Sequence, residues 1–298
     1  MKETPVPTGP ADDRIGVGIA NVLVAVFCFS IVDVIAKWLG QSYPAVQILF
    51  FRYLFGLIPV AVFVWLSGGL PALRTRRPYA HAVRAGLLFV ALLLFFEALR
   101  GLALAEAIAV AFTAPLFITA LAGPVLGETV GPRRWAAVII GFLGALIMVR
   151  PGTAAFQPEA LLVLGSAFFF SLLVLLTRRM TRTESNVALL AYSNILAGAY
   201  SLPFVVPVWR APAWGDMWLF VVIGLVGALA AFLVIRAYRH APVSVLAPFE
   251  YTALLWGTIF GWALWRDRPE LPVWIGAAII VLATFYITRR EAATARRA

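Results

Sequence analysis

Five charged side chains stand inside long apolar runs of this chain, where an ionisable group is expensive unless it has a partner or a task. They are Asp33, Arg52, Glu97, Glu106 and Glu250. Charged groups that are paired or shielded in an apolar surrounding are where proteins commonly place binding and proton-transfer chemistry. We therefore take these five residues as candidates for a binding or coupling site, and ask which elements must position them.

Local pairing is the simplest alternative for two of the acids. Asp33 and Lys37 are four residues apart, and Glu97 and Arg100 are three apart. Both spacings bring side chains together on a helix. For Arg52 the alternatives are a structural ion pair with an acid on a neighbouring helix, or a position at the outer mouth of a cavity beside one of these acids.

Glu250 belongs to the segment "APFEYTALLW", together with Tyr251 and Trp256. A carboxylate in a partly dry site can bind a substrate cation or carry a proton. The alternative is an interior carboxylate satisfied by its neighbours. Among the many aromatic residues, Phe112, Tyr251 and Trp256 are our candidates for contact with a substrate.

Catalytic and metal chemistry find little support in the sequence. It has no GxxxxGK[ST] phosphate loop and no HExxH metal motif, and it contains one cysteine, Cys28, and two histidines, His81 and His240. Asp33 is the only aspartate deep in an apolar run, so an intramembrane aspartyl protease would lack its second carboxylate. We expect no catalytic residue, no metal ligand, no cofactor and no enzyme activity.

The composition places the chain in a membrane. Its 298 residues are 62% hydrophobic and 13% charged, whereas soluble domains have about 45–50% apolar and about 25% charged residues. A core of this size could not bury that excess, so lipid must be a partner. The net charge of +10 does not indicate nucleic acid, because the basic residues form short clusters between apolar runs.

Ten apolar runs are long enough, at about 20 residues, to cross a bilayer as helices. The connections between them are short, so consecutive helices should be antiparallel. The predicted spans are 15–39, 44–66, 80–100, 104–125, 133–150, 159–180, 187–208, 216–238, 243–264 and 272–288.

The basic residues predict the orientation, because cytoplasmic loops carry an excess of Lys and Arg. With the N-terminus inside, the inner segments hold 17 of the 24 basic residues and the outer ends hold 6, with Arg52 within a span. The start, "MKETPVPTGPADDR", does not resemble a cleaved signal peptide, so the first run is expected to remain as an anchor. We predict a bacterial-type inner-membrane protein with both termini in the cytoplasm.

Two polar stretches indicate an internal duplication. "LGETVGPRRW" at 126–135 aligns with "WRDRPELPVW" at 265–274 at an offset of 139, which matches Glu128 with Asp267 and Trp135 with Trp274. Nearer the N-terminus an offset of 141 matches Lys37 with Arg178. An odd number of helices per unit inserts the second copy upside down. The predicted fold is therefore an all-α membrane protein of ten transmembrane helices arranged as two inverted five-helix repeats, and 126–135 is a cytoplasmic turn rather than a reaction centre.

The predicted organisation is two repeats between short tails. It comprises a cytoplasmic tail at 1–14, a first repeat at 15–152, an inverted second repeat at 153–290 and a cytoplasmic tail at 291–298. Inverted repeats of this kind are typical of transporters, whose substrate site lies between the halves.

The sequence resembles the EamA-type, ten-helix members of the drug/metabolite transporter superfamily over roughly residues 15–290. "AEAIAVAFTAPLFITALAGPVLGETVGPRRWAAVIIGFLGALIMVRPG" is similar to the family's fourth and fifth helices, and "FFRYLFG" at 50–56 to its second. The second half matches less well, with Leu254 where the family often has proline and Arg266-Asp267 where it has Gly-Glu. The resemblance implies a carrier of small organic metabolites, with a cavity lined by the first, third, fourth, sixth, eighth and ninth helices.

The leading hypothesis is a secondary transporter that moves a small metabolite, amino acid-like, flavin-like or otherwise amphipathic, by alternating access. Protons or a counter-substrate are the candidate coupling partners. The alternatives are an uncoupled facilitator or channel of the same fold, and a membrane sensor or scaffold.

Overall fold

The chain forms a bundle of helices in the computed structural model, which describes residues 11–127, 130–181, 183–241 and 243–295. No β-strand occurs among these residues, so the all-α prediction is confirmed. Glu128, in the turn singled out from the sequence, lies outside the described residues. The other elements of that turn are visible, because Gly127 ends one helix in a left-handed conformation and Pro132 begins the next.

Within the described ranges, eight helical segments are long and apolar enough to cross a membrane. Six of them are single helices, one is a helix extended by the short 3₁₀ turn η2 (Val206–Val208), and one, Leu104–Leu126, is a pair of shorter helices. The seven helices involved besides that pair are α1 (Ala11–Leu39), α2 (Ala45–Leu66), α3 (Pro78–Ala98), α6 (Pro132–Val149), α7 (Glu159–Met180), α8 (Asn186–Val205) and α9 (Trp214–His240).

Two of the predicted spans are interrupted. The fourth consists of α4 (Leu104–Ala111) and α5 (Ala114–Leu126). The ninth consists of α10 (Val243–Glu250), α11 (Thr252–Phe260) and the π-helical turn η3 (Gly261–Trp265). Pro115 explains the first break, because a proline ring clashes with the carbonyl four residues earlier, here that of Ala111. The tenth predicted span lies within α12 (Leu271–Ala295), and η1 (Leu70–Leu73) is a short turn after α2.

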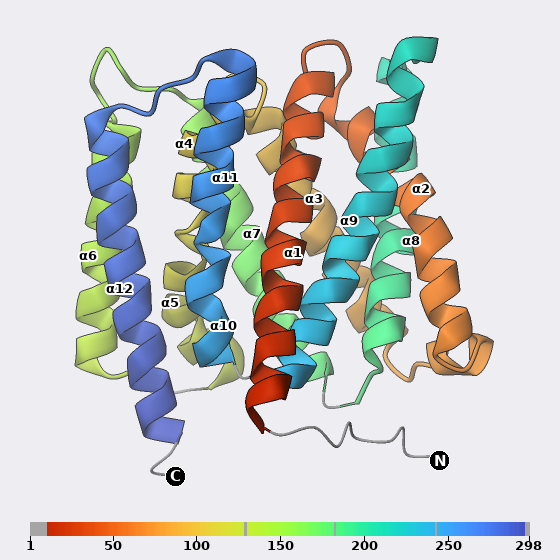
Figure 1. Cartoon of the computed structure of the whole chain (residues 1–298), viewed down its shortest axis with the longest axis horizontal. Helices are drawn as coiled ribbons and strands as arrows, with labels where there is room; N and C mark the ends of the chain where they lie inside the picture. The colour runs from red at the N-terminus through yellow and green to blue at the C-terminus, as the bar shows by residue number, and fades with distance from the viewer. Residues whose placement is uncertain (1–10, 128–129, 182, 242, 296–298) are drawn as a thin grey trace.

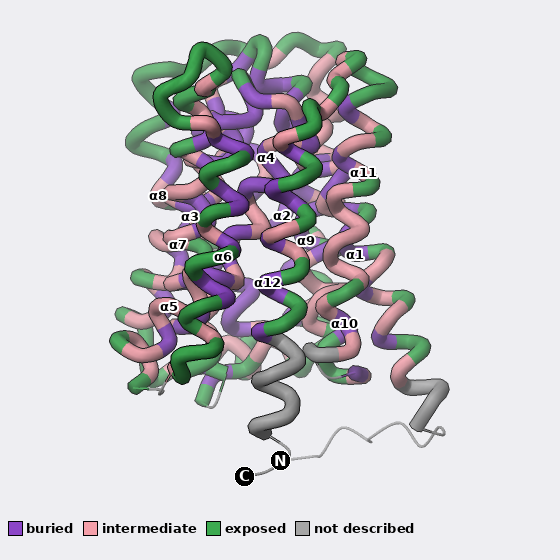
Figure 2. Tube along the Cα trace, turned by 90° about the vertical axis from the view of Figure 1, so that its left-hand side faces the viewer, coloured by how far each residue is buried: buried purple, intermediate pink, exposed green. Residues whose placement is uncertain are grey.

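Helices of the N-terminal half pack mainly on helices of the C-terminal half (Figure 1). α1 packs along α9 and α7 packs along α3, while α2 lies against α8 and α6 against α12. Figure 2 shows α6 and α12 side by side on one face, with buried residues along the sides they share. We call the end at which α1 finishes and α12 starts the upper end, as drawn in Figure 1, and the opposite end the lower end.

Close helix packing depends on glycines at the crossing points. A Cβ on Gly224 of α9 would lie 2.6 Å from Phe55 Cβ and 2.8 Å from the backbone nitrogen of Gly56 on α2. A Cβ on Gly276 of α12 would lie 2.5 Å from the carbonyl oxygen of Gly144 on α6. Small residues let helix backbones approach in this way, which is a main source of association where lipid supplies no hydrophobic drive.

The connection between α1 and α2 is hydrogen-bonded to the start of α9 at the upper end. The Tyr43 hydroxyl donates to Asp216 Oδ2 (2.7 Å) and accepts from the backbone N–H of Ala213 (3.0 Å). Gln47 exchanges two hydrogen bonds with the backbone of Arg210 (2.6 and 2.9 Å). Burial raises the pKa of the Tyr43 phenol, so the hydroxyl stays protonated and able to donate.

A matching junction ties the α7–α8 connection to the segment before α3 at the lower end. Glu184 lies 3.2 Å from His81 Nε2, and the two side chains are 2% and 1% exposed. Burial by itself raises the pKa of Glu184, but hydrogen bonds from the Thr75 hydroxyl, His81 and the Arg76 backbone together hold that pKa below its usual value. Tyr192 packs its ring on His81, which completes the junction.

Replacing Gly224 with alanine should destabilise the bundle by about 1–3 kcal/mol, because the added methyl group has no room against α2. The matched control is Gly215→Ala on the same helix, where an added Cβ meets no atom within 4 Å. Thermal unfolding of the detergent-purified protein measures the difference. Equal unfolding temperatures for the two variants would contradict this packing.

The Glu184 junction predicts that Glu184→Gln lowers the free energy of unfolding by an amount that depends on pH. Because the folded pKa is below the usual value, the carboxylate stabilises the fold at neutral pH, and this contribution disappears as the pH falls below about 4. Glu184→Gln should therefore cost about 1–3 kcal/mol at pH 7 and progressively less in acid. Glu97→Gln, which alters an exposed pair, is the control, and a pH-independent deficit in Glu184→Gln would count against the assignment.

Candidate functional site

Arg52 of α2 and Asp33 of α1 form the most deeply placed charged pair of the predicted set. Each lies six or seven residues from the upper end of its helix, or roughly 10 Å at 1.5 Å per residue. Both are half-buried, and their charges interact. The distance between their charged atoms exceeds that of an ion pair, because no contact within 4.0 Å joins them among the described residues. The two charges therefore interact without forming an ion pair.

The fold leaves room for the Arg52 guanidinium beside α9. A Cβ on Gly227 would lie 3.1 Å from Arg52 Nε and 3.4 Å from Nη2, so the guanidinium rests against bare backbone. Its Cζ atom also lies 5.5 Å from the centre of the Tyr53 ring. In the described part of the chain, Arg52 Nε has no hydrogen-bond partner, and the buried Tyr53 hydroxyl, which interacts with the Arg52 side chain, has no acceptor for its own hydrogen. Buried donors are nearly always paired, and these two unpaired donors belong to neighbouring residues.

Arg84 of α3, which lies at a similar distance from the opposite, lower end of the bundle, provides a contrast. Its Nε donates to Thr177 (2.8 Å), and its Nη1 donates to the Leu189 carbonyl (2.9 Å) and to the Ser193 hydroxyl. These contacts join α3 to α7 and α8, so Arg84 is a structural residue. Arg52 has no comparable set of partners.

Lys37 lies one helical turn above Asp33 but does not pair with it, so the local i,i+4 pairing is not what the structure contains. Its Nζ donates to the carbonyls of Leu99 (3.4 Å) and Leu102, and lies 3.9 Å from Asp267 Oδ2. The connection after α3 ends in carbonyls without helical partners, and these attract the amine. Lys37 thus joins α1 to the α3–α4 connection and to the turn before α12.

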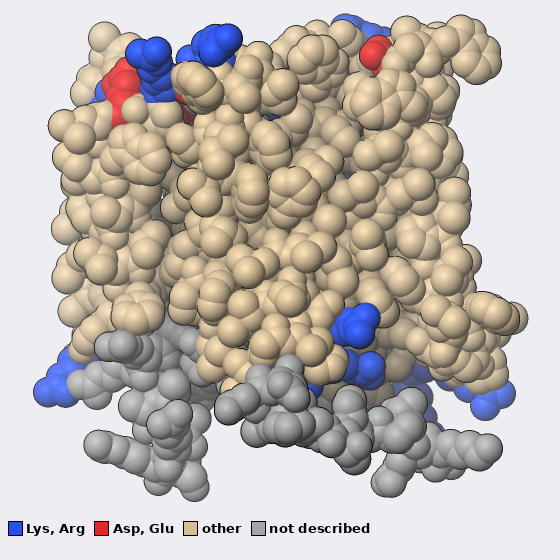
Figure 3. Space-filling model, viewed as in Figure 1, with Lys and Arg blue, Asp and Glu red and all other residues tan. Residues whose placement is uncertain are grey.

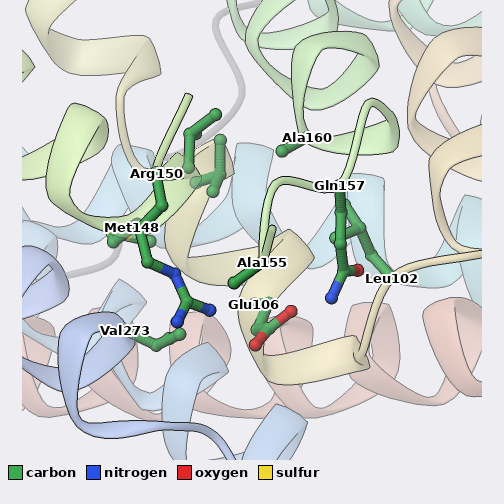
Figure 4. Close-up of a pocket in the computed structure, with 10 residues that line it drawn as sticks. Leu102, Glu106, Met148, Arg150, Ala155, Gln157, Ala160 and Val273 are labelled. Carbon is green, nitrogen blue, oxygen red and sulfur yellow. The ribbon is translucent and has the colours of Figure 1, made fainter. Parts of the chain in front are cut away.

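Glu106 lines a small pocket at the upper end, where its carboxylate faces the Arg150 guanidinium and Gln157 (Figure 4). Arg150 is also bound to Glu270 at 2.5 Å. The pocket has a volume of about 20 Å³, room for about one water and far too little for a metabolite. Together with Lys37 and Asp267, these charges form what we call the upper charge cluster: Lys37, Glu106, Arg150, Asp267 and Glu270.

Glu97 is in neither group. It pairs with Arg100 at 2.5 Å, and the two side chains are 44% and 41% exposed. The local i,i+3 interpretation is therefore the one that the structure supports, and Glu97 does not join Arg52 at a cavity mouth.

The aromatic candidates and Glu250 lie lower in the bundle. Glu250 accepts a hydrogen bond from the Tyr238 hydroxyl of α9. Phe112 and Tyr251, at the breaks of the two interrupted helices, place their ring centres 4.9 Å apart. Trp256 packs against Phe27 at 4.8 Å. The eight predicted site residues therefore fall into separate groups rather than one.

Sequence reasoning missed Tyr53, Gly227, Lys37 and Tyr238 as members of these groups. Tyr53 adjoins Arg52 in the chain, and that adjacency was an available signal. Gly227 and Tyr238 had no such signal, because their roles depend on which face of α9 meets α1, α2 and α10.

The apolar helices define a multi-pass membrane protein, and comparison with known proteins shows its family. The model of the EamA-like transporter family matches the chain twice, over residues 16–150 and 157–289. The chain therefore belongs to the EamA-like transporter family.

Relatives over nearly the full length carry the names of transporters. The chain is 31% identical to the S-adenosylmethionine uptake transporter of Rickettsia prowazekii, over 92% of this chain and 93% of that protein. It is 30% identical to the riboflavin transporter of Vibrio cholerae, over 93% and 94%. A solved crystal structure matches the fold with a TM-score of 0.63 at 21% identity, over 92% of this chain and 98% of that one.

Proposed function

We propose that the protein is a secondary transporter that moves a small organic metabolite across the inner membrane by alternating access. The observation that carries the proposal is the difference between the two ends of the bundle. At the upper end, α4 packs on α11 and the upper charge cluster ties α1, α4, α6 and the turn before α12 together. At the lower end, the corresponding segments α5 and α10 have at most marginal contact among the described residues and lie on opposite sides of the bundle (Figure 2). One end is sealed while the other is splayed, as alternating access requires.

Several contacts support two inverted repeats as the basis of this motion. The upper pair Tyr43–Asp216 and the lower pair Glu184–Thr75 occupy equivalent positions in the two repeats. At an offset of 141, Tyr43 corresponds to Glu184 and Thr75 corresponds to Asp216. Phe112 and Tyr251 differ by 139 and touch each other, as equivalent residues do on a two-fold axis. The family model also matches twice along the chain. Ten membrane-crossing segments follow if the α10–α11 segment and α12 each cross once.

The charges support an orientation with the lower end in the cytoplasm. Among the described residues, the lower end carries mainly arginines, whereas basic and acidic side chains are mixed at the upper end (Figure 3). This is the asymmetry of the positive-inside rule. α1 begins and α12 ends at the lower end, which supports cytoplasmic termini and an upper end on the outer face.

The relatives' names support small organic metabolites as cargo, because S-adenosylmethionine and riboflavin are both of this kind. Glu250, which ends α10 and accepts a hydrogen bond from Tyr238 of α9, is our candidate for the proton-carrying residue.

Flux into liposomes tests the proposal. We expect purified protein to move radiolabelled S-adenosylmethionine or riboflavin saturably, and unlabelled solute inside to accelerate entry, because an alternating carrier returns faster when loaded. A channel would show no such acceleration, an uncoupled facilitator would not respond to a pH gradient, and a sensor or scaffold would move nothing. A pH gradient should change the rate in the wild type and not in Glu250→Gln; a gradient effect retained in that variant would remove Glu250 from proton coupling.

The Lys37 contacts predict a variant that opens the outer end. Lys37→Met removes the amine that holds the Leu99 and Leu102 carbonyls and Asp267, so the population should shift toward an outward-open state. A single cysteine at position 33, in a Cys28→Ser background, should then react severalfold faster with a membrane-impermeant maleimide added outside. Arg268→Met, which removes an exposed charge at the same end, is the control. Equal labelling in the two variants would show that Lys37 does not hold the seal.

A further inference from the structure

We infer that Asp33, Arg52 and Tyr53 bind the amino-acid end of a zwitterionic solute, with its carboxylate on Arg52 and Tyr53 and its ammonium group on Asp33. This assignment rests on the proposed transport function and narrows its substrate class. It also separates the two kinds of solute that the relatives' names suggest, because riboflavin carries neither a carboxylate nor an ammonium group at neutral pH.

The carboxylate half of the site is a set of donors without acceptors. Within the described chain neither Arg52 Nε nor the Tyr53 hydroxyl, which can only accept from Arg52, has an acceptor for its hydrogen, and Gly227 leaves one side of the guanidinium against backbone only. A planar guanidinium binds a carboxylate through two parallel hydrogen bonds. A phenol that is only 2% exposed adds a third donor and cannot be satisfied by bulk water.

The part of the site that would bind the ammonium group is Asp33, a hydrogen-bond acceptor to which no described side chain donates. Asp33 receives no hydrogen bond from any described side chain and has no ion pair within 4.0 Å. Lys37, the cation best placed to neutralise it, is held one turn higher by the Leu99 and Leu102 carbonyls. Asp33 is therefore left to an incoming cation, while Arg52 stays close enough to interact with it.

Only a solute with both charges matches the pair. A neutral flavin would desolvate Asp33 and Arg52 without pairing them, and unpaired charges are strongly unfavourable in a dry site. A simple amine would leave Arg52 unmatched, and a simple anion would leave Asp33 unmatched. The upper charge cluster lies above the pair, so in this conformation the solute would approach from the lower end.

The test measures binding of matched ligands to the purified full-length protein by isothermal calorimetry. The probes are S-adenosylmethionine, its decarboxylated analogue, L-methionine and riboflavin. We expect at least one of the two zwitterions to bind, and decarboxylated S-adenosylmethionine to bind roughly 30-fold more weakly than the intact compound, the factor that corresponds to about 2 kcal/mol for one lost charged contact. In Arg52→Gln that discrimination should disappear, because the group that reads the carboxylate is gone.

Two control variants separate binding from stability. Arg84→Gln removes the arginine that joins α3 to α7 and α8. It should lower the unfolding temperature and keep the discrimination against the decarboxylated ligand. Glu97→Gln should change neither the unfolding temperature nor this discrimination. If Asp33 and Arg52 serve only as a structural pair, Arg52→Gln will lower stability and leave the ligand preference as it was, and that result overturns the assignment.

The failure of this assignment is distinguishable from failure of the transport function. Binding and flux of riboflavin without those of either zwitterion would overturn the substrate class and leave the transporter standing. Absence of binding by all four probes would also overturn the class. Absence of flux for every metabolite in liposomes of folded protein would count against transport itself.

Discussion

In a bilayer every charge and every interrupted helix end must be satisfied inside the protein, since lipid offers neither hydrogen bonds nor counter-charges. The arrangement of this chain follows from that constraint. Lys37 satisfies the carbonyls left open after α3, and Arg84 donates three hydrogen bonds to α7 and α8. The two helix breaks face each other through Phe112 and Tyr251 rather than facing lipid. Because the partners of Arg84 and of Phe112 come from the second half of the sequence, satisfying them forces the halves to interleave.

Against that background, a group left unsatisfied is informative. Arg52 and Arg84 have the same chemistry and lie at similar distances from opposite ends of the bundle, yet Arg84 donates three hydrogen bonds and Arg52 Nε donates none within the described chain. The difference lies in the opposite helix. Ser193 of α8 offers a hydroxyl to Arg84, whereas Gly227 of α9 offers Arg52 only space. A serine on the opposite helix accepts a hydrogen bond and makes the arginine structural, whereas a glycine leaves the donors of the arginine free for a ligand.

The helical class, the positions of the apolar spans and the family could be predicted from the sequence, because hydrophobic length and composition are properties of the chain alone. The local pair Glu97–Arg100 could be predicted for the same reason, since its spacing is fixed by the helix. The partners of Lys37 and Arg52 could not. Lys37 was an equal candidate for Asp33 by spacing, but carbonyls 62 and 65 residues away hold its amine. Long-range choices of this kind depend on how α1, α3 and α9 rotate against one another, which no local pattern records.

The duplication helps to separate structural residues from residues that recognise a solute, because features of the scaffold should occur in both repeats. Features needed to build either half recur in both: the loop junctions at Tyr43 and Glu184, the helix breaks at Phe112 and Tyr251, and the left-handed helix ends at Gly127 and Arg266. The charges that we propose for recognition and coupling do not recur. At the same offsets, Asp33 corresponds to Val174, Arg52 to Ser193 and Glu250 to Ala111. A symmetric scaffold can open toward either face, but a solute is not symmetric, so the residues that recognise it must differ between the halves. Asp33 and Arg52, which form no ion pair within the described chain, are both found at such unmatched positions.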